Sequence, residues 1–149
     1  MTIDQRAADL GLVVQDIMKQ FQAVNAAAAN GPHVALNQQE LRVVEFLGHD
    51  GSQMMRALAD YLSLAVNSVT SVADGLEQKG LIHRQRSEED RRVVLVELTE
   101  SGRETYNALE ASKLQLFRSM LGPLTIDEQE ILLVLFRKIA RVGREQVQL

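Results

Sequence analysis

The sequence is poor in several residue types: it has no cysteine, no tryptophan and two prolines, and aromatic residues make up 4% of its 149 residues. The absence of cysteine excludes disulfide bonds, thiolate metal sites and a regulatory switch based on thiol oxidation. No stretch approaches the roughly 18 consecutive apolar residues that a membrane-spanning helix needs. The N-terminus, "MTIDQRAADLGLVV", lacks the features of a signal peptide. We therefore expect a cytoplasmic protein with a core of aliphatic side chains.

The overall charge is acidic, but the basic residues are unevenly distributed. The formal net charge of −4, taken alone, argues weakly against a nucleic-acid partner. Residues 79–92, however, contain five Lys or Arg and three acidic residues, and residues 137–144 contain four basic residues and no acidic one. These two basic regions leave nucleic-acid binding open.

Apolar residues recur at steps of three and four along most of the chain, which is the pattern of amphipathic helices. Helix caps are predicted at Asn37 with Glu40, at Thr99, and at "TIDE" (125–128). "NGPH" at 30–33 and "GP" at 122–123 are predicted helix ends, and "GHDG" at 48–51 is a predicted turn. The predicted helices cover 5–29, the residues from the Asn37 cap to 47, about 54–62, about 66–79, the residues from Thr99 to the "GP" pair, and those from the "TIDE" box through 142.

Between the fourth and fifth helices, "LIHRQR" (81–86) and "VVLVEL" (93–98) are predicted strands of a hairpin. The turn between the two strands is rich in charged residues of both signs. Two short helices joined by a tight turn and followed by a hairpin form a winged helix-turn-helix. The predicted fold class is thus mainly α (α+β), with a two-stranded wing flanked by N- and C-terminal helices.

The second helix of this motif has a small, polar outer face. With Val69 as the buried centre, steps of 100° per residue place Asn67, Ser71, Asp74 and Gln78 furthest outward, with Ser68, Thr70 and Gly75 beside them. Small polar side chains allow a helix to approach base edges in a DNA major groove. The hairpin arginines suit a phosphate backbone or a narrow minor groove, and the neighbouring acidic residues would brace the turn.

At this point the residues resemble a known family, the MarR family of bacterial transcriptional regulators. The family's wing signature, Asp-x-Arg followed by five residues and Leu-Thr, is present from Asp90 to Thr99. The stretch "ALADYLSLAVNSVTSVADGLEQKGLIHR" is similar to the family's two-helix segment, and "LTESGRE" (98–104) to the entry of its long dimer helix. The resemblance is close over residues 36–104.

The resemblance implies a ligand-responsive, sequence-specific transcriptional regulator, most often a repressor. It implies an obligate homodimer, in which 1–35 and 100–149 form a helical dimerisation region and 36–99 form the DNA-binding domain. Such a dimer reads a pseudo-palindromic operator in double-stranded DNA, with half-sites about 34–36 Å apart.

Carried over to this chain, Asp90 braces the wing, Arg92 enters the minor groove, and Asn67, Ser68, Thr70 and Ser71 read the major groove. Ser71 and Gly75 stand where the family often has longer or basic residues. We therefore expect modest specificity and a strong dependence on the hairpin arginines Arg84, Arg86, Arg91 and Arg92.

The family resemblance also implies a small aromatic or anionic effector, bound in a crevice between the dimer helices and the DNA-binding lobe. No cofactor is expected. The histidines, His33, His49 and His83, lie in separate predicted elements without metal-ligand spacing, so no metal site is predicted. Candidate crevice residues are Met18, Phe21, Phe46, Met54, Met55 and Tyr106, although such residues at helical spacing usually belong to a core.

Two other functional classes compete with DNA binding. Catalysis is disfavoured, because Glu88, Glu89 and Asp90 are adjacent on a turn and do not converge on a substrate, and no nucleophile set or phosphate loop is present. The alternative is a winged helix that binds a protein partner and not DNA, for which the acidic net charge and an outward-facing Asp74 are the reasons. Asp74 could instead pair with Arg84 or Arg86. The sequence does not identify the operator, the target genes or the effector.

Overall fold

The computed structural model describes residues 1–29 and 35–147, so the helix end predicted at 30–33 lies outside the described residues. The chain divides into two compact units, Met1–Lys113 and Leu114–Leu149, which are described separately. The predicted domain boundary near residues 99–100 remains a prediction. Within the described residues, no helix is both long and apolar enough to cross a membrane.

The helices begin where the sequence predicts their capping residues. Asn37 and Glu40 form a reciprocal capping box at the start of the second helix. The Thr99 hydroxyl accepts the backbone N–H three residues further on, and Thr125 and Glu128 form a second box. The helices are α1 (Ile3–Ala29), α2 (Gln38–Asp50), α3 (Met55–Leu62), α4 (Val66–Gln78), α5 (Glu100–Leu121) and α6 (Ile126–Val147).

The prediction that "GHDG" (48–51) is a turn was wrong, because α2 continues through Asp50. Gly48 is helical and lies against the ring of Tyr106, so an ideal Cβ on it would be 2.2 Å from a ring carbon. Arg103 donates a hydrogen bond to the Gly48 carbonyl oxygen at 3.1 Å. Gly48 therefore allows α5 to approach α2 closely, and it does not end the helix.

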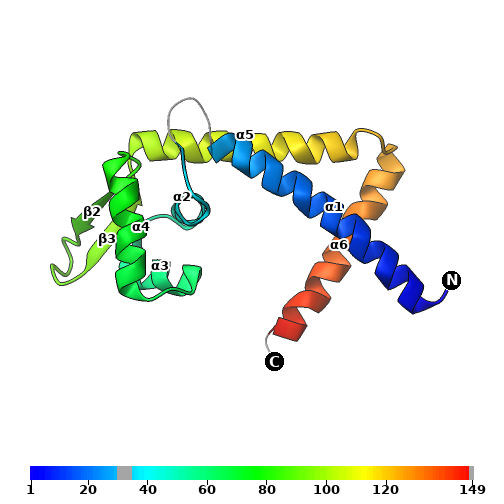
Figure 1. Ribbon diagram of the computed structural model, residues 1–149, viewed down its shortest axis with the longest axis horizontal. Helices are drawn as coiled ribbons and strands as arrows, with labels where there is room; N and C mark the ends of the chain where they lie inside the picture. Colours follow the sequence, from blue (N-terminus) through cyan, green and yellow to red (C-terminus); the bar gives the residue numbers. More distant parts are fainter. Residues whose placement is uncertain (30–34, 148–149) are drawn as a thin grey trace. The chain divides into compact units, whose positions relative to one another are not determined.

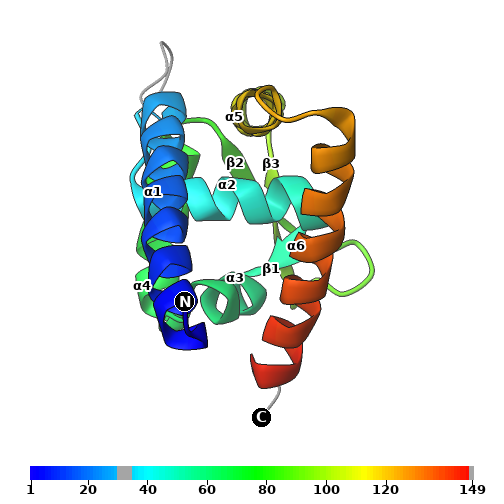
Figure 2. The same cartoon turned by 90° about the vertical axis from the view of Figure 1, so that its right-hand side faces the viewer.

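The predicted two-stranded wing is confirmed, and a short third strand that was not predicted joins it to form a three-stranded antiparallel sheet. Its strands are β1 (Gln53–Met54), β2 (Ile82–Arg86) and β3 (Val94–Leu98), in the order β1-β3-β2. β1 pairs with Val96 and Leu95 of β3, and it lies next to α3 (Figure 2). A two-residue strand has no alternation for a sequence pattern to reveal, so β1 could not be predicted from the residues alone.

The hydrophobic core lies in the first unit, where α2, α3, α4 and the sheet gather around the start of α5 (Figure 1). Val69 is fully buried, which confirms it as the centre of the inner face of α4. Each of these elements contributes at least one side chain that is 0–1% exposed, among them Val44, Leu47, Leu58, Val69, Leu76, Ile82, Val96 and Leu109. We refer to this part of the first unit, residues 35–109, as the winged-helix lobe.

The terminal helices differ from the lobe, because their apolar side chains are largely exposed within the single chain. α6 has no buried residue. The large apolar residues that are at least 40% exposed include Leu10, Val13, Val14 and Met18 in α1, and Ile131, Leu135, Phe136, Ile139 and Val142 in α6. Exposed apolar side chains in such numbers on each helix mark an interaction site.

The end of α4, the start of β2 and the start of α5 meet at Leu81. The Leu81 backbone N–H donates to Leu76, and the Leu81 carbonyl oxygen accepts the Thr99 N–H at 3.0 Å. Thr99 Oγ1 donates to the Gly80 carbonyl oxygen at 2.6 Å. Gly102 lies so close that an ideal Cβ would be 2.0 Å from the Leu81 carbonyl oxygen. Because the added Cβ would meet a backbone atom, no side chain could rotate away to relieve the clash.

Gly102→Ala is therefore expected to lower the free energy of unfolding by about 3 kcal/mol or more, the upper range for overpacking. Gly11→Ala, in the interior of α1 with nothing within 4 Å of the added Cβ, is the matched control. It should raise the free energy of unfolding by about 0.5–1 kcal/mol, because alanine is the better helix former. Urea titrations of both variants measure the difference, and equal stabilities would contradict the close approach at Leu81.

Candidate nucleic-acid interface

The turn between α3 and α4 sets the direction of α4. Ser63 adopts a left-handed conformation with φ of 55°, and it is the only non-glycine residue with positive φ among those described. The Leu64 backbone N–H then donates to the Ala59 carbonyl oxygen at 3.0 Å, which closes the end of α3. Ala65 is extended, and α4 begins at Val66. α4 thereby packs its inner face on α2 and α3.

The outer face of α4 presents most of the residues predicted to read DNA. Asn67, Ser68 and Ser71 are exposed, whereas Thr70 is half-buried. The Thr70 hydroxyl donates to the Val66 carbonyl oxygen at 2.9 Å, so its donor is used within the helix. Asn67, Ser68 and Ser71 are thus accessible to a partner, and Thr70 is the least available of the four predicted residues.

Gly75 does not lie on this outer face, which corrects its predicted position. An ideal Cβ on Gly75 would be 3.4 Å from a carboxylate oxygen of Glu40 in α2. The residue therefore faces the interior of the lobe, where Glu40 itself is buried. The helical wheel placed it only one step from the outer face and could not reveal the neighbouring helix.

Arg84 is held by two acidic residues of α4. Its guanidinium group is hydrogen-bonded to Asp74, and Glu77 Oε2 accepts from Arg84 Nε at 2.7 Å. The hydrogen bonds that Arg84 donates to Asp74 and Glu77 raise its pKa. The Arg84 side chain is only 28% exposed. Of the four predicted arginines, Arg84 thus connects β2 to α4 and is the least available to an external anion.

The wing turn is closed by hydrogen bonds within residues 86–93. Ser87 N–H donates to the Val93 carbonyl oxygen at 2.8 Å, and Val93 N–H donates to the Asp90 carbonyl oxygen at 3.0 Å. Arg86 also serves this turn, because its Nη1 donates to the carbonyl oxygen of Arg91 at 2.9 Å. The turn is therefore a defined loop that holds its own backbone.

Asp90 makes the contacts that a wing brace requires. One carboxylate oxygen accepts both the backbone N–H and the Nε of Arg92, each at 3.1 Å, and the other accepts from Nη2 at 3.3 Å. The hydrogen bonds from the Arg92 side chain and backbone lower the pKa of Asp90. The Arg92 side chain remains 92% exposed, so it is oriented at its base and open to solvent along its length.

Arg91 is exposed, and among the described residues it forms no ion pair. The four predicted arginines therefore divide into two kinds. Arg84 and Arg86 hold parts of the lobe together, while Arg91 and Arg92 extend outward from the wing turn. The second basic region predicted from the sequence, Arg137 to Arg144, is exposed along α6 in the other unit.

The histidines have local partners where the structure describes them. His83 Nε2 lies within hydrogen-bonding distance of Glu97 Oε1 and of Gln85 Nε2, and His49 lies 3.2 Å from Asp50. His33 lies outside the described residues. Over residues 1–29 and 35–147, no group of three or more His, Asp or Glu side chains is placed to hold a metal ion.

Of the six residues predicted for an effector crevice, two lie together in one cavity of the single chain. Phe46 and Tyr106 line a cavity of about 310 Å³, while Met18 and Met54 are exposed and Met55 packs against the core. Phe46 also stacks on Tyr61 with ring centroids 4.3 Å apart.

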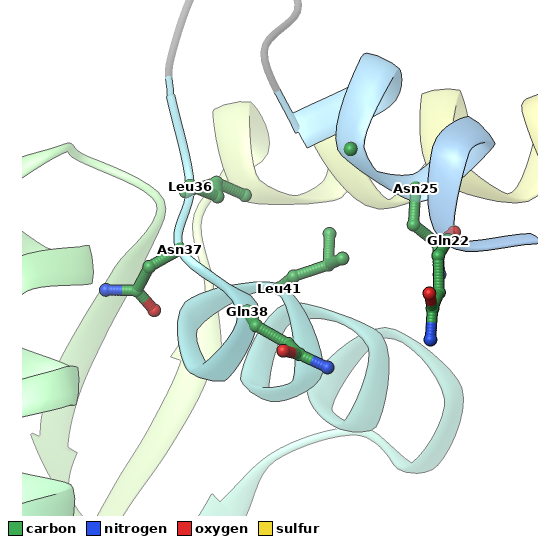
Figure 3. A pocket seen from close by; sticks show the side chains of 7 residues that line it. Gln22, Asn25, Leu36, Asn37, Gln38 and Leu41 are labelled. Atoms are coloured by element: carbon green, nitrogen blue, oxygen red, sulfur yellow. The ribbon is translucent and has the colours of Figure 1, made fainter. Parts of the chain in front are cut away.

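A cavity of about 400 Å³ lies elsewhere, between α1 and the start of α2 (Figure 3). Its lining contains four amide side chains and no charged residue: Gln22, Asn25, Ala26, Leu36, Asn37, Gln38 and Leu41. The sequence marked only Asn37 among these, as a helix cap. Amides at the ends of two helices carry no pattern that indicates a shared cavity.

Comparisons with known proteins agree with this arrangement of α3, α4 and the wing. The family model "MarR family" matches residues 36–94. The transcriptional regulator MhqR of Bacillus subtilis is 34% identical over 104 residues, which cover 70% of this chain and 72% of that protein. The chain belongs to the MarR family. Like the family and the relatives that it matches, the protein is a transcriptional regulator and not an enzyme.

Other MarR-family members extend the similarity. The transcriptional repressor MdtR of Bacillus subtilis is 30% identical over 125 residues, covering 84% of this chain and 79% of MdtR. The crystal structure of YusO from Bacillus subtilis, at 27% identity, has a TM-score of 0.76 and covers 95% of this chain and 99% of YusO. Streptococcus pneumoniae FabT, solved in complex with DNA, shares the fold at 18% identity, with a TM-score of 0.80 over 94% of this chain and 99% of FabT.

The Arg84 contacts predict a measurable coupling between β2 and α4. In a double-mutant cycle of Arg84→Met and Glu77→Gln, we expect a coupling energy of about 0.5–1 kcal/mol in urea unfolding, the upper range for a partly exposed pair. As a control, Arg84→Met and Glu130→Gln of α6 should have additive effects on the free energy of unfolding. Additivity in the Glu77 cycle as well would mean that Arg84 does not hold the wing strand to α4.

Proposed function

We propose that this MarR-family regulator is a homodimeric, sequence-specific DNA-binding protein that represses transcription and responds to a small molecule. The observation that carries the proposal is the pairing of the small polar face of α4 with the outward arginines of the wing turn. A helix of this kind fits a major groove, and an arginine on an adjacent turn fits the minor groove or the phosphates beside it. We place the protein in the cytoplasm, where a bacterial chromosome is found.

The contacts of Asp74 remove a reason for the alternative, a winged helix that binds only protein. Asp74 was expected either to face outward from α4 or to pair with Arg84 or Arg86. In the structure Asp74 and Glu77 are both bonded to Arg84, which offsets part of their negative charge. Asn67, Ser68 and Ser71 then dominate the face that would approach the bases.

Dimerisation is supported by the exposed apolar side chains of the terminal helices. Ile131, Leu135, Ile139 and Val142 follow one another at steps of four and three residues, so they share one face of α6, and all are exposed in the single chain. A second copy is the occupant we propose, because a two-fold dimer places two α4 helices on two half-sites of an operator. Residues 1–35 and 100–149 would supply its dimerisation region, and 36–99 its DNA-binding domain.

Leu135→Glu should therefore convert the dimer to a monomer, since it introduces a charge into an apolar interface. Arg141→Glu, on the polar side of the same helix, should leave the dimer intact. Sedimentation velocity at micromolar protein measures both. A wild-type chain that sediments as a monomer would rule out the homodimer.

Sequence-specific DNA binding is tested by selecting a site from a random-sequence pool and titrating the purified chain by fluorescence anisotropy at several salt concentrations. If binding includes phosphate contacts, the logarithm of the association constant should fall linearly with the logarithm of the salt concentration. The slope should be about 0.9 for each phosphate contacted. A winged helix that binds only protein would select no site, and this result would overturn the proposal.

Arg92→Ala should lower the affinity for the selected site by roughly 5- to 150-fold, the cost of losing one groove or phosphate contact. The salt slope should fall by about 0.9 if Arg92 contacts one phosphate. Arg6→Ala in α1 is the control and should bind as the wild type does. Circular dichroism should be unchanged in both, because Arg92 bonds only within its own turn. Wild-type affinity in Arg92→Ala would exclude Arg92 from the interface.

For the effector, the cavity of about 400 Å³ between α1 and α2 is the site we propose (Figure 3). Its lining combines amide donors and acceptors with the apolar side chains of Leu36 and Leu41, without a charged group to pair with an anion. The lining thus supports an uncharged ligand with hydrogen-bonding groups, in place of the anion that the family resemblance suggested.

A further inference from the structure

One ion pair, between a buried carboxylate and a partly exposed ammonium group, joins the start of α2 to the end of α4. Glu40 is 3% exposed, and Lys79 Nζ lies 2.8 Å from each of its carboxylate oxygens. Lys79 also donates to the carbonyl oxygen of Ala35 at 2.8 Å. Glu40 Oε1 accepts the backbone N–H of Asn37 at 3.1 Å. Both charged groups are therefore bonded to the backbone of the segment 35–37.

This ion pair restrains the last turn of α4. Lys79 is the C-terminal cap of the helix, and a buried carboxylate that loses its partner is strongly unfavourable. Gly75, one turn earlier, leaves the space that the Glu40 carboxylate occupies. Lys79 lies at the opposite end of α4 from Asn67 and Ser68, the first residues of its exposed face. The pair therefore acts on the direction of α4 and not on DNA itself.

The segment that holds the ion pair also forms a wall of the cavity between α1 and α2. Leu36, Asn37 and Gln38 line this cavity, and they lie in sequence between Ala35 and Glu40 (Figure 3). Neither Glu40 nor Lys79 is part of the lining. A molecule in the cavity would contact residues 36–38 of this segment, and the ion pair is bonded to the backbone of Ala35 and Asn37.

We propose that Glu40 and Lys79 are positioning residues for DNA recognition, and that they transmit the occupancy of this cavity to α4. The inference rests on the DNA binding proposed above. A cavity occupant that favours one arrangement of segment 35–40 changes, through the ion pair, the population of α4 orientations that fit an operator. The coupling needs no contact between the occupant and α4.

The first test compares Lys79→Met with Lys79→Arg and with the double variant Glu40→Gln/Lys79→Met, which removes both charges and leaves no buried unpaired carboxylate. With the full-length chain and the selected DNA site, we expect Lys79→Met and the double variant to bind roughly 2- to 30-fold more weakly, the range for residues that carry coupling. Lys79→Arg should restore binding. Affinity for a scrambled sequence should be unchanged in all three.

The same titrations distinguish a positioning role from a phosphate contact and from a purely stabilising role. If Lys79 contacts a phosphate, the salt slope falls by about 0.9 and binding to the scrambled sequence weakens equally, which overturns the proposal. If the pair serves stability alone, the melting temperature falls while the affinity of the folded protein for the selected site is unchanged, which also overturns it. A wild-type chain that selects no DNA site would instead remove the proposed function on which the inference rests.

The second test fills the cavity by substitution. Ala26→Phe places a ring among the lining residues, and Ala27→Phe, one position along α1 and outside the lining, is the matched control. We expect Ala26→Phe to change the affinity for the selected site in the wild-type background and to have no effect in the Glu40→Gln/Lys79→Met background. An effect of equal size in both backgrounds, or one shared by Ala27→Phe, would show that the ion pair does not carry the signal.

Discussion

The backbone contacts at Leu81 determine how the three parts of the winged-helix lobe are joined. Leu81 closes the end of α4 through its N–H, directly precedes β2, and accepts a hydrogen bond from Thr99 at the start of α5. Gly102 packs against the same carbonyl oxygen. Because α4 and the wing both extend from this point, the backbone contacts at Leu81 and the contacts of Arg84 with Asp74 and Glu77 together hold the wing to α4.

The arginines of the hairpin divide into those that make contacts within the lobe and those that remain exposed on its surface. Arg84 is bonded to two carboxylates of α4, and Arg86 is bonded to the backbone of the wing turn. Arg91 and Arg92 remain exposed, with Asp90 orienting the base of the latter. Asp74, Glu77 and Asp90 thus lie close to arginines that they hold in place, which explains the presence of these three carboxylates near a surface proposed to meet phosphate.

The parts of the fold that the sequence predicts well are those with local signals. The caps at Asn37, Thr99 and Thr125 and the buried position of Val69 were all predicted and are confirmed, because each depends on residues within one or two turns. The errors came from distant contacts. Gly48 is helical because Tyr106 packs on it from α5, and Gly75 faces inward because Glu40 lies across from it. β1 exists because β3 offers it a partner.

The exposed face of α4 has a consequence for how such a regulator can diverge. Asn67, Ser68 and Ser71 pack on nothing else in the lobe, whereas the glycines at 48 and 102 have no room for even one methyl group. Substitutions on the outer face should therefore change folding little, so duplicated copies of the gene can alter this surface one residue at a time while the core stays the same. The core and the exposed face of α4 can therefore change independently of each other. This agrees with the several relatives that the chain has within one bacterium.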